Sequence, residues 1–501
     1  MLKSIAAATF LAALAGLAGP RGAEAQSVLT YHNSPNRHGA FTVPGLTAAA
    51  AAHMHLGFHA TISGNVYAQP LYWQPPGAKT GLLIVATESN LVYALNANTG
   101  ARVWQTQLGK PVPSGTLPCG DIAPEGVTGA PVIDPDTGRL YLDAMTLQGA
   151  GNLPRHLVYA LSLSDGKIVP HWPLNVDNEM ARRHASFTSE LQGQRGALQF
   201  FKGKLYIPFG GRAGDCGGST GAIYRGVVVE VTPGTTPAIT GNWATRAARG
   251  GIWAQGGISS DGFSLFATTG NTSGANTWGD GEGVIRLKPG LARPTRPADL
   301  FTPANWKDLD NADADLGGTA AMPFTVGSGP GRVGRLLALG KDGHAYLLNS
   351  QAFGGIGREL LNVQVSNSRI MTGPAVYVGP SATMVAFFDY EGLGQNCSGT
   401  SLTMLRITAK PANTIQRIWC APLNGSGAPI ITTTDGTANP IVWIAGAEGD
   451  NELHGFNLFT GKTLFAGGGT GMTGLHHFGT LIAANRHLYV AADNGVYAFT
   501  F

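Results

Sequence analysis

A short segment that recurs along the chain constrains its fold more than any other feature of the sequence. Residues 92–99 read Val-Tyr-Ala-Leu-Asn-Ala-Asn-Thr, and the segment continues through Gly100 to Trp104. Alternating apolar residues are typical of a β-strand, and the polar residues before Gly100 are typical of a tight turn. A strand, a turn and a second strand, repeated at intervals, indicate a β-propeller.

Eight copies of this segment can be aligned on the fourth position of the phrase, at Leu95, Leu161, Val231, Leu287, Leu348, Ile407, Phe456 and Phe499. The intervals are roughly 40 to 70 residues, which suits four-stranded blades joined by some long loops. We therefore expect an all-β protein, an eight-bladed propeller of four-stranded antiparallel blades, with residues 53–501 forming a single domain. Gly-rich and Asn-rich segments at 152–156, 212–220, 271–283 and 392–401 are expected to be loops.

The last copy ends at Phe501, so its blade lacks an outer strand. The segment from His53 to Ile62 precedes the first blade and alternates apolar and polar residues as a strand does. An open propeller would leave sheet edges exposed, and we therefore expect this N-terminal segment to close the ring.

The N-terminus resembles an export signal. It carries Lys3, an apolar run from Ile5 to Leu17 and the small-x-small triplet Ala23-Glu24-Ala25. We expect residues 1–25 to be a signal peptide, cleaved near Gln26, and residues 26–52 to lead into the propeller of a periplasmic or secreted protein. A buried N-terminal helix is the alternative. No later apolar run reaches the ~20 residues that cross a bilayer, so no transmembrane segment is expected.

Export makes disulfides available to the four cysteines, which allow three connectivities. We favour Cys397 with Cys420, which are close in sequence, and Cys119 with Cys216. The formal net charge is only +3 and no block of Lys or Arg occurs, so the sequence gives no support for nucleic-acid binding.

Residues 94–104 resemble the Ala-x-Asp-x-x-Thr-Gly-Lys-x-x-Trp repeat of pyrroloquinoline-quinone (PQQ) propeller enzymes and their relatives, with Asn96 and Ala101 as departures. The resemblance covers most of the chain after residue 25 and implies the same eight-bladed fold. Non-catalytic relatives use the same blades, so activity must be argued from the site.

Two segments resemble cofactor-binding segments of that family. In the segment from Gly250 to Asn271, the resemblance implies that Trp253 lies beneath the quinone and that Asn271 binds calcium. At Lys341-Asp342-Gly343, it implies that the lysine bonds the quinone oxygens; an exposed turn lysine is the alternative.

The segment from Asp310 to Leu316 resembles one whose first aspartate is the proposed base, so Asp310 is the candidate catalytic residue and a candidate calcium ligand. Leu309 and Ala312 depart from the family pattern. The alternatives are a solvated acidic loop, or a structural calcium loop in which Asn311, Asp313 and Asp315 place oxygens at alternate positions.

Three positions contradict a quinone site. Gly120 stands where the family has the second of two adjacent cysteines, Glu125 stands where it has an arginine, and Ile223 replaces a calcium-binding glutamate. A negative charge at Glu125 has the wrong sign for pairing with quinone carboxylates, and calcium would lose an anionic ligand.

Other polar residues offer weaker candidates. The adjacent histidines His476 and His477, with His184, could bind a metal at a pore mouth; the alternative is one buried and one exposed residue on a strand. Arg195 could reach the central funnel and bind an anion, or form an ion pair at the start of a strand.

Two functions follow from these observations. The first is a PQQ-dependent and calcium-dependent dehydrogenase of alcohols or sugars, in which Asp310 takes the hydroxyl proton, Lys341 polarises the quinone and Trp253 supports it. The second is a non-catalytic propeller, with no cofactor, that binds a protein, a glycan or another ligand through its loop face.

Overall fold

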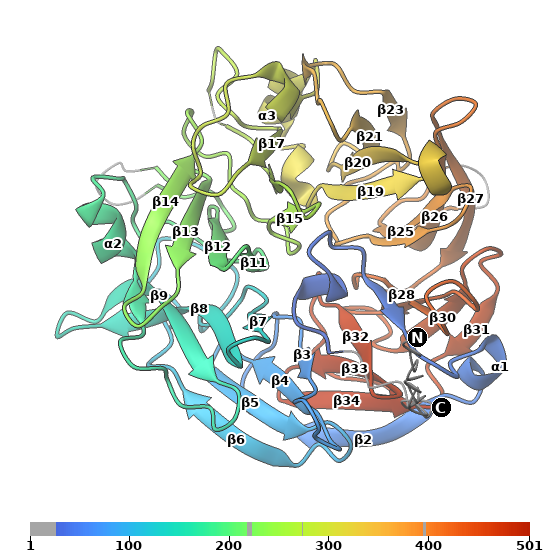
Figure 1. Ribbon diagram of the computed structural model, residues 1–501, viewed down its shortest axis with the longest axis horizontal. Helices are drawn as coiled ribbons and strands as arrows, with labels where there is room; N and C mark the ends of the chain where they lie inside the picture. The colour runs from blue at the N-terminus through green and yellow to red at the C-terminus, as the bar shows by residue number, and fades with distance from the viewer. Residues whose placement is uncertain (1–26, 218–222, 273, 394–396) are drawn as a thin grey trace, which may run out of the picture.

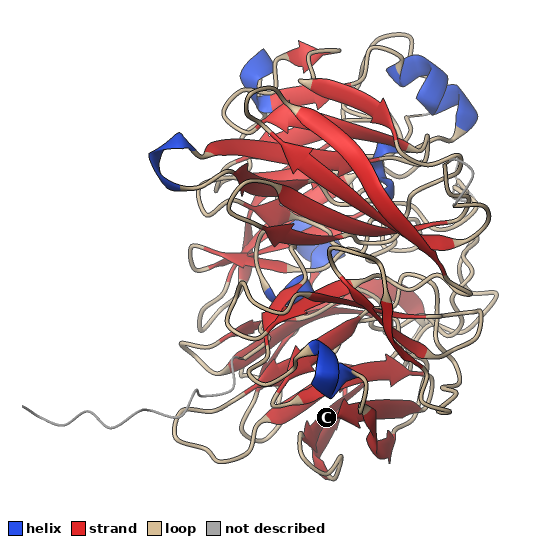
Figure 2. Cartoon of the chain, turned by 90° about the vertical axis from the view of Figure 1, so that its right-hand side faces the viewer, coloured by secondary structure: helices blue, strands red, loops and turns tan. Residues whose placement is uncertain are grey.

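The computed structural model describes residues 27–217, 223–272, 274–393 and 397–501. Eight β-sheets follow one another in chain order around a central axis (Figure 1). The expected all-β, eight-bladed propeller is confirmed. Figure 2 shows the ring from the side, with sheets through its whole depth. The expected signal peptide falls outside the described residues. Among the described helices, none is long and apolar enough to cross a membrane.

The first four blades run from the inner strand outward in the order of their numbering. Blade one contains β3 (Leu71–Trp73), β4 (Leu82–Ala86), β5 (Leu91–Asn96) and β6 (Arg102–Gln107). Blade two contains β7 (Val132–Asp134), β8 (Arg139–Gln148), β9 (Leu153–Ser162) and β10 (Leu174–Asn175). Blade three contains β11 (Gln199–Phe201), β12 (Lys204–Phe209), β13 (Val227–Thr232) and β14 (Ala238–Ala244). Blade four contains β15 (Ser259–Ser260), β16 (Leu265–Thr268), β17 (Val284–Leu287) and β18 (Leu300–Thr302), with β22 (Gly355–Ile356) added in parallel at its edge.

The other four blades complete the ring. Blade five contains β19 (Met322–Val326), β20 (Val333–Leu339), β21 (His344–Asn349) and β23 (Leu361–Gln364). Blade six contains β24 (Ala375–Val378), β25 (Thr383–Asp389), β26 (Ser401–Thr408) and β27 (Thr414–Pro422). Blade seven contains β28 (Ile430–Thr433), β29 (Ile441–Ala445), β30 (Leu453–Asn457) and β31 (Thr463–Ala466), and β1 (Ala40–Thr42) lies parallel to β28. Blade eight contains β32 (Leu481–Ala484), β33 (His487–Ala492), β34 (Gly495–Thr500) and β2 (His55–Thr61).

Helices are short and few among the described residues. The α-helices are α1 (Ala48–Ala51), α2 (Val176–Arg182) and α3 (Trp306–Ala312). Single 3₁₀ turns are η1 (Tyr31–Asn33), η2 (Pro297–Asp299), η3 (Leu316–Gly318) and η4 (Gly329–Gly331). The body of the protein is therefore sheet, as the repeat predicts.

The recurring segment is the third strand of every blade. Its eight copies lie in β5, β9, β13, β17, β21, β26, β30 and β34. The apolar residues of these strands are buried between neighbouring blades, where they form a series of separate hydrophobic clusters. The apolar residues that made the segment recognisable in the sequence are therefore the ones that pack between blades.

The turn after the third strand joins one blade to the next. Trp104 of blade one donates its indole N–H to the Leu163 carbonyl of blade two at 3.0 Å. A Cβ atom on Gly166, whose φ is +72°, would lie 2.5 Å from the Trp104 ring. Glycine is needed there both for its backbone conformation and for the space that the preceding blade's tryptophan fills. Trp419 repeats this contact on Leu458 and Gly461.

The expected closing strand is also confirmed. The strand β2 pairs antiparallel with β34, from His55 opposite Thr500 to Thr61 opposite Gly495. The preceding chain is tied into the ring as well, because β1 extends blade seven. Arg37 is fully buried and donates to the carbonyls of Ile258 and Leu198, from blades four and three. Residues before the first blade thus hold together parts of the ring that are distant in sequence.

Both expected disulfides are present, Cys119–Cys216 and Cys397–Cys420. One loop prediction is wrong. Residues 152–156 belong largely to the long hairpin of β8 and β9, in which Gln148 pairs with Leu153. The described parts of the other three Gly-rich segments connect the second and third strands of blades three, four and six.

Candidate functional site

A cavity of about 210 Å³ lies where loops from several blades meet. Its lining comes from the chain before β3, β7, β11, β15 and β32, from the β29–β30 loop and from η1. Loops that lead into the inner strands, and loops between second and third strands, emerge at the same end of an antiparallel blade. The cavity therefore opens at the loop face of the propeller.

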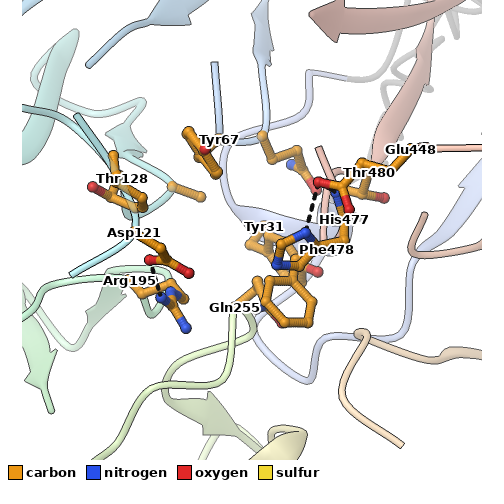
Figure 3. A pocket seen from close by; sticks show the side chains of 13 residues that line it. Tyr31, Tyr67, Asp121, Thr128, Arg195, Gln255, Glu448, His477, Phe478 and Thr480 are labelled. Carbon is orange, nitrogen blue, oxygen red and sulfur yellow. Dashed lines mark hydrogen bonds and ion pairs between the residues drawn. The ribbon is translucent and has the colours of Figure 1, made fainter. Parts of the chain in front are cut away.

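Arg195 and Asp121 lie on one side of this cavity, and His477 and Phe478 lie on the other (Figure 3). The guanidinium of Arg195 is 3.7 Å from the Asp121 carboxylate and 5.8 Å from the centre of the Phe478 ring. Arg195 donates no hydrogen bond to any of the described residues. Arg195 therefore lines the central cavity, as the anion-binding hypothesis requires, and it also has an acidic neighbour, as the ion-pair hypothesis requires.

The two adjacent histidines line and support the same cavity. His477 contacts the Glu448 carboxylate at 2.7 Å, and His476 contacts Asp493 at 2.8 Å and stacks on the Tyr67 ring. The expected placement on opposite faces of a strand is wrong, because both histidines lie in the loop before β32. The described residues contain no group of three or more His, Cys, Asp or Glu side chains that could hold a metal ion.

The cavity wall contains polar groups without partners. Gln255 is buried, and neither its amide oxygen nor its amide nitrogen has a hydrogen-bond partner in the described part of the chain. The Tyr31 hydroxyl is likewise buried and unpartnered. An unpaired buried polar group costs about 1–3 kcal/mol, so each such group in a native wall requires an explanation.

Beside the cavity, Asp315 gathers three of the positions that the family resemblance singled out. Its carboxylate contacts the Lys341 ammonium at 2.7 Å, accepts from the Trp253 indole N–H at 3.1 Å and accepts from the Asn271 backbone N–H at 2.8 Å. Lys341 also lies 5.1 Å from the centre of the Trp253 ring. The Trp253 ring is 6.5 Å from Phe478, so this cluster adjoins the cavity.

Asp310 lies next to the cluster and outside it. It sits on α3 and accepts from the Thr272 backbone N–H at 2.5 Å and from the Thr272 hydroxyl at 3.0 Å. Burial raises the pKa of Asp310 and the Thr272 bonds oppose that rise. The helix α3 contains the first three residues of the segment from Asp310 to Leu316, for which a solvated acidic loop was one of the alternatives.

A buried glutamate completes the acidic surroundings. Burial raises the pKa of Glu282 well above its usual range, and the Asp315 charge raises it further. Burial also raises the pKa of Asp315, with Lys341 acting in the opposite direction. Asp315 has three donors, whereas Glu282 receives only the Leu316 backbone N–H and its other oxygen is unpartnered among the described residues. The surroundings therefore favour the charged form more at Asp315, which is paired with Lys341, than at Glu282.

The three departures from the family pattern are structurally accounted for. Cys119, which precedes Gly120, pairs with Cys216. Glu125 is buried and ion-paired with Arg212, whose other N–H groups donate to backbone carbonyls that include Gln192. The Ile223 side chain is 53% exposed. Arg212 is thus already engaged by Glu125, and the Ile223 side chain has no oxygen to offer a cation.

These contacts test whether PQQ and calcium fit. PQQ carries three carboxylates, which require cations, but Arg212 and Lys341 are already paired with Glu125 and Asp315, and Arg195 in the cavity wall would meet only one of the three. Calcium requires six to eight oxygens, whereas Ile223 has no side-chain oxygen and Asp310 is bonded by Thr272. The described residues do not supply partners for all three carboxylates or a ligand set for the metal, and we derive no reaction step through either group.

No family model and no curated protein sequence matches this chain. Its fold is shared with solved structures. Quinohemoprotein alcohol dehydrogenase from Comamonas testosteroni superposes with a TM-score of 0.63 at 15% identity, over 95% of this chain and 80% of that one. A europium-containing methanol dehydrogenase gives 0.61 at 13% identity, over 95% and 98%. BamB from Moraxella catarrhalis gives 0.51 at 12% identity, over 89% and 100%. The chain has the PQQ-type propeller fold. At these identities the likeness concerns fold alone, and it includes dehydrogenases and BamB alike.

Sequence reasoning missed Asp315 as the centre of the cluster and Gln255 as an unpartnered wall residue. A signal for Asp315 was present, since it is the third carboxylate of the 310–315 segment and directly precedes an apolar residue and two glycines. No sequence signal distinguishes Gln255, because its lack of partners depends on loops from other blades.

Proposed function

We propose that this protein is a binding propeller that holds a small polar molecule in the axial cavity of its loop face. The observation that carries the proposal is Gln255, a buried cavity-lining amide with both polar atoms unpartnered in the described chain. A ligand that donates to the amide oxygen and accepts from the amide nitrogen removes this cost.

The size and walls of the cavity support a small ligand. A volume of about 210 Å³ corresponds to about seven water molecules, below the usual range for drug-sized ligands. Tyr67 and Phe478 supply aromatic faces, and Thr128 and Gln255 supply polar groups. A few polar groups among aromatic walls are typical of small-molecule sites.

A quinone-dependent dehydrogenase of alcohols or sugars is the second candidate. It is favoured by the convergence of Trp253, Asn271 and Lys341 on one carboxylate beside the cavity. The occupied cations and the missing calcium ligand at Ile223 favour the binding protein. For either function we propose an oxidising compartment outside the cytoplasm, because two disulfides are retained.

One titration separates the candidates. The protein is titrated with PQQ and calcium while quinone absorbance and dye reduction by alcohols and sugars are recorded, and in parallel with a panel of small sugars and organic acids by calorimetry. Saturable binding of a panel compound that Gln255→Met weakens, without dye reduction, supports the binding protein. Quinone binding with turnover would replace it by the dehydrogenase.

A further inference from the structure

Arg195 lines the axial cavity, and its ion pair with Asp121 is long. Its side chain is 24% exposed, whereas that of Asp121, its nearest carboxylate at 3.7 Å, is 56% exposed and largely hydrated. Two buried arginines, by contrast, have several acceptors: Arg37 donates to four oxygens, and Arg212 to one carboxylate and three carbonyls. Arg195 alone of these three has no hydrogen-bond acceptor within the described chain.

The acidic groups around Arg195 do not supply that acceptor. Glu448 lies across the cavity, and its carboxylate is bonded by both the backbone N–H and the ring of His477. Glu88 accepts from the backbone N–H of Gly126, and burial raises the pKa of Glu88 to about 8, so it is largely uncharged at neutral pH. The cavity therefore presents a guanidinium fork that donates no hydrogen bond within the described chain and whose anionic partner there is the exposed Asp121 at 3.7 Å.

Gln255 stands beside this fork. The backbone N–H of Ala197, two residues after Arg195, donates to the backbone carbonyl of Gln255 at 2.8 Å, and this bond joins the two segments. A carboxylate on Arg195 can accept from the guanidinium in bidentate fashion and from the Gln255 amide nitrogen. The Gln255 amide oxygen is then left for a hydroxyl donor on the same ligand.

We propose that the axial cavity binds a small organic monocarboxylate that carries hydroxyl groups, with its carboxylate on Arg195 and Gln255 and its body between Tyr67 and Phe478. This inference rests on the proposed binding function. Sugar acids and hydroxylated aromatic acids share the required chemistry, since a sugar face and an aromatic ring both pack on aromatic side chains.

The test measures binding by isothermal titration calorimetry at low salt. The probes are 4-hydroxybenzoate and galacturonate, each with a neutral counterpart, 4-hydroxybenzamide and galactose. We expect at least one acid to bind at least tenfold more tightly than its neutral counterpart, a difference of about 1.4 kcal/mol, because a charge-assisted hydrogen bond is stronger than a neutral one. Binding of 4-hydroxybenzoate would indicate a hydroxylated aromatic acid as the ligand, and binding of galacturonate would indicate a sugar acid.

Variants locate the effect. Arg195→Ala removes no internal hydrogen bond and is expected to weaken the acid about tenfold or more, whereas Asp121→Asn removes the competing carboxylate and is expected to tighten it. Lys202→Ala is the matched control, because Lys202 follows β11, as Arg195 precedes it, and lies 4.9 Å from a ring centre, that of Phe201. It is expected to leave affinity unchanged.

The outcomes are distinguishable. Equal binding of acids and neutral counterparts, or unchanged affinity in Arg195→Ala, overturns the carboxylate inference and leaves the binding function standing. No saturable binding of any of the four probes at millimolar concentration overturns the carboxylate inference; the wider panel of sugars and acids then decides the binding function by itself.

Discussion

Replacing Gln255 with methionine tests whether its amide truly lacks partners in the free protein. Methionine is similar in length and apolar, so the change removes two unpaired polar atoms from a buried site. An unpaired buried atom costs about 1–3 kcal/mol, and the lower end applies here because the amide borders the cavity; for two atoms we therefore expect Gln255→Met to raise the free energy of unfolding by about 2 kcal/mol without ligand. At about 2.1 cal/mol/K of unfolding entropy per residue, this chain's melting temperature would rise by roughly 2 °C.

Gln69 provides the control within the same cavity wall. Its amide oxygen accepts from the His32 backbone N–H at 2.8 Å, and its nitrogen donates to the Thr30 carbonyl at 3.3 Å. Gln69→Met breaks these bonds and is expected to lower the free energy of unfolding by about 1–3 kcal/mol. Calorimetry of both variants decides the matter. If Gln255→Met destabilises the protein as Gln69→Met does, the amide is already bonded and the reasoning is refuted.

Three further perturbations address other parts of the loop face. Burial raises the pKa of Glu88 from 4.5 to about 8, so between these pH values the folded state keeps a proton that the unfolded chain releases. The contribution of Glu88 to stability is therefore full below about pH 4.5 and is lost as the pH rises to about 8. Urea midpoints measured across this range should fall less in Glu88→Gln than in the unchanged protein. Removing Cys119–Cys216, which spans 97 residues, is expected to cost about 4–5 kcal/mol in urea, against about 3 kcal/mol for Cys397–Cys420, which spans 23; the reverse order would contradict the chain-entropy argument. Lys341→Met leaves Asp315 without its cation and should lower the unfolding free energy by about 3 kcal/mol, partly restored by adding Asp315→Asn; an unchanged urea midpoint would show that the pair is not structural.

The fold was predictable because its signals are local. Each third strand alternates over a few residues, and Gly100 and Gly166 mark turns within the same segment. The closing strand β2 was predictable because the last blade was one strand short. The pairing of β1 with β28 was not, since three residues gain a partner nearly 400 positions away.

The candidate site was predictable only in part, because it is built from loops of different blades. The family resemblance pointed to Trp253, Asn271 and Lys341, and these residues do meet. Which aspartate they meet depends on the end of α3, where Asp313 adopts a left-handed conformation and the following residues lead Asp315 inward. Such a backbone reversal has no reliable signature in a single sequence.

The pairing of β2 with β34 has a consequence for the order in which the chain can fold. His55 pairs with Thr500, which is more than 400 residues away in the sequence, so the ring cannot close until the final strand is available. Contacts between such distant residues require a slow search by the chain ends, and they raise the contact order of the whole protein. During that search β34 and the outer edge of the eighth sheet are exposed to other chains. The strand that completes the propeller therefore also ends the period in which the folding chain is most prone to associate with its copies.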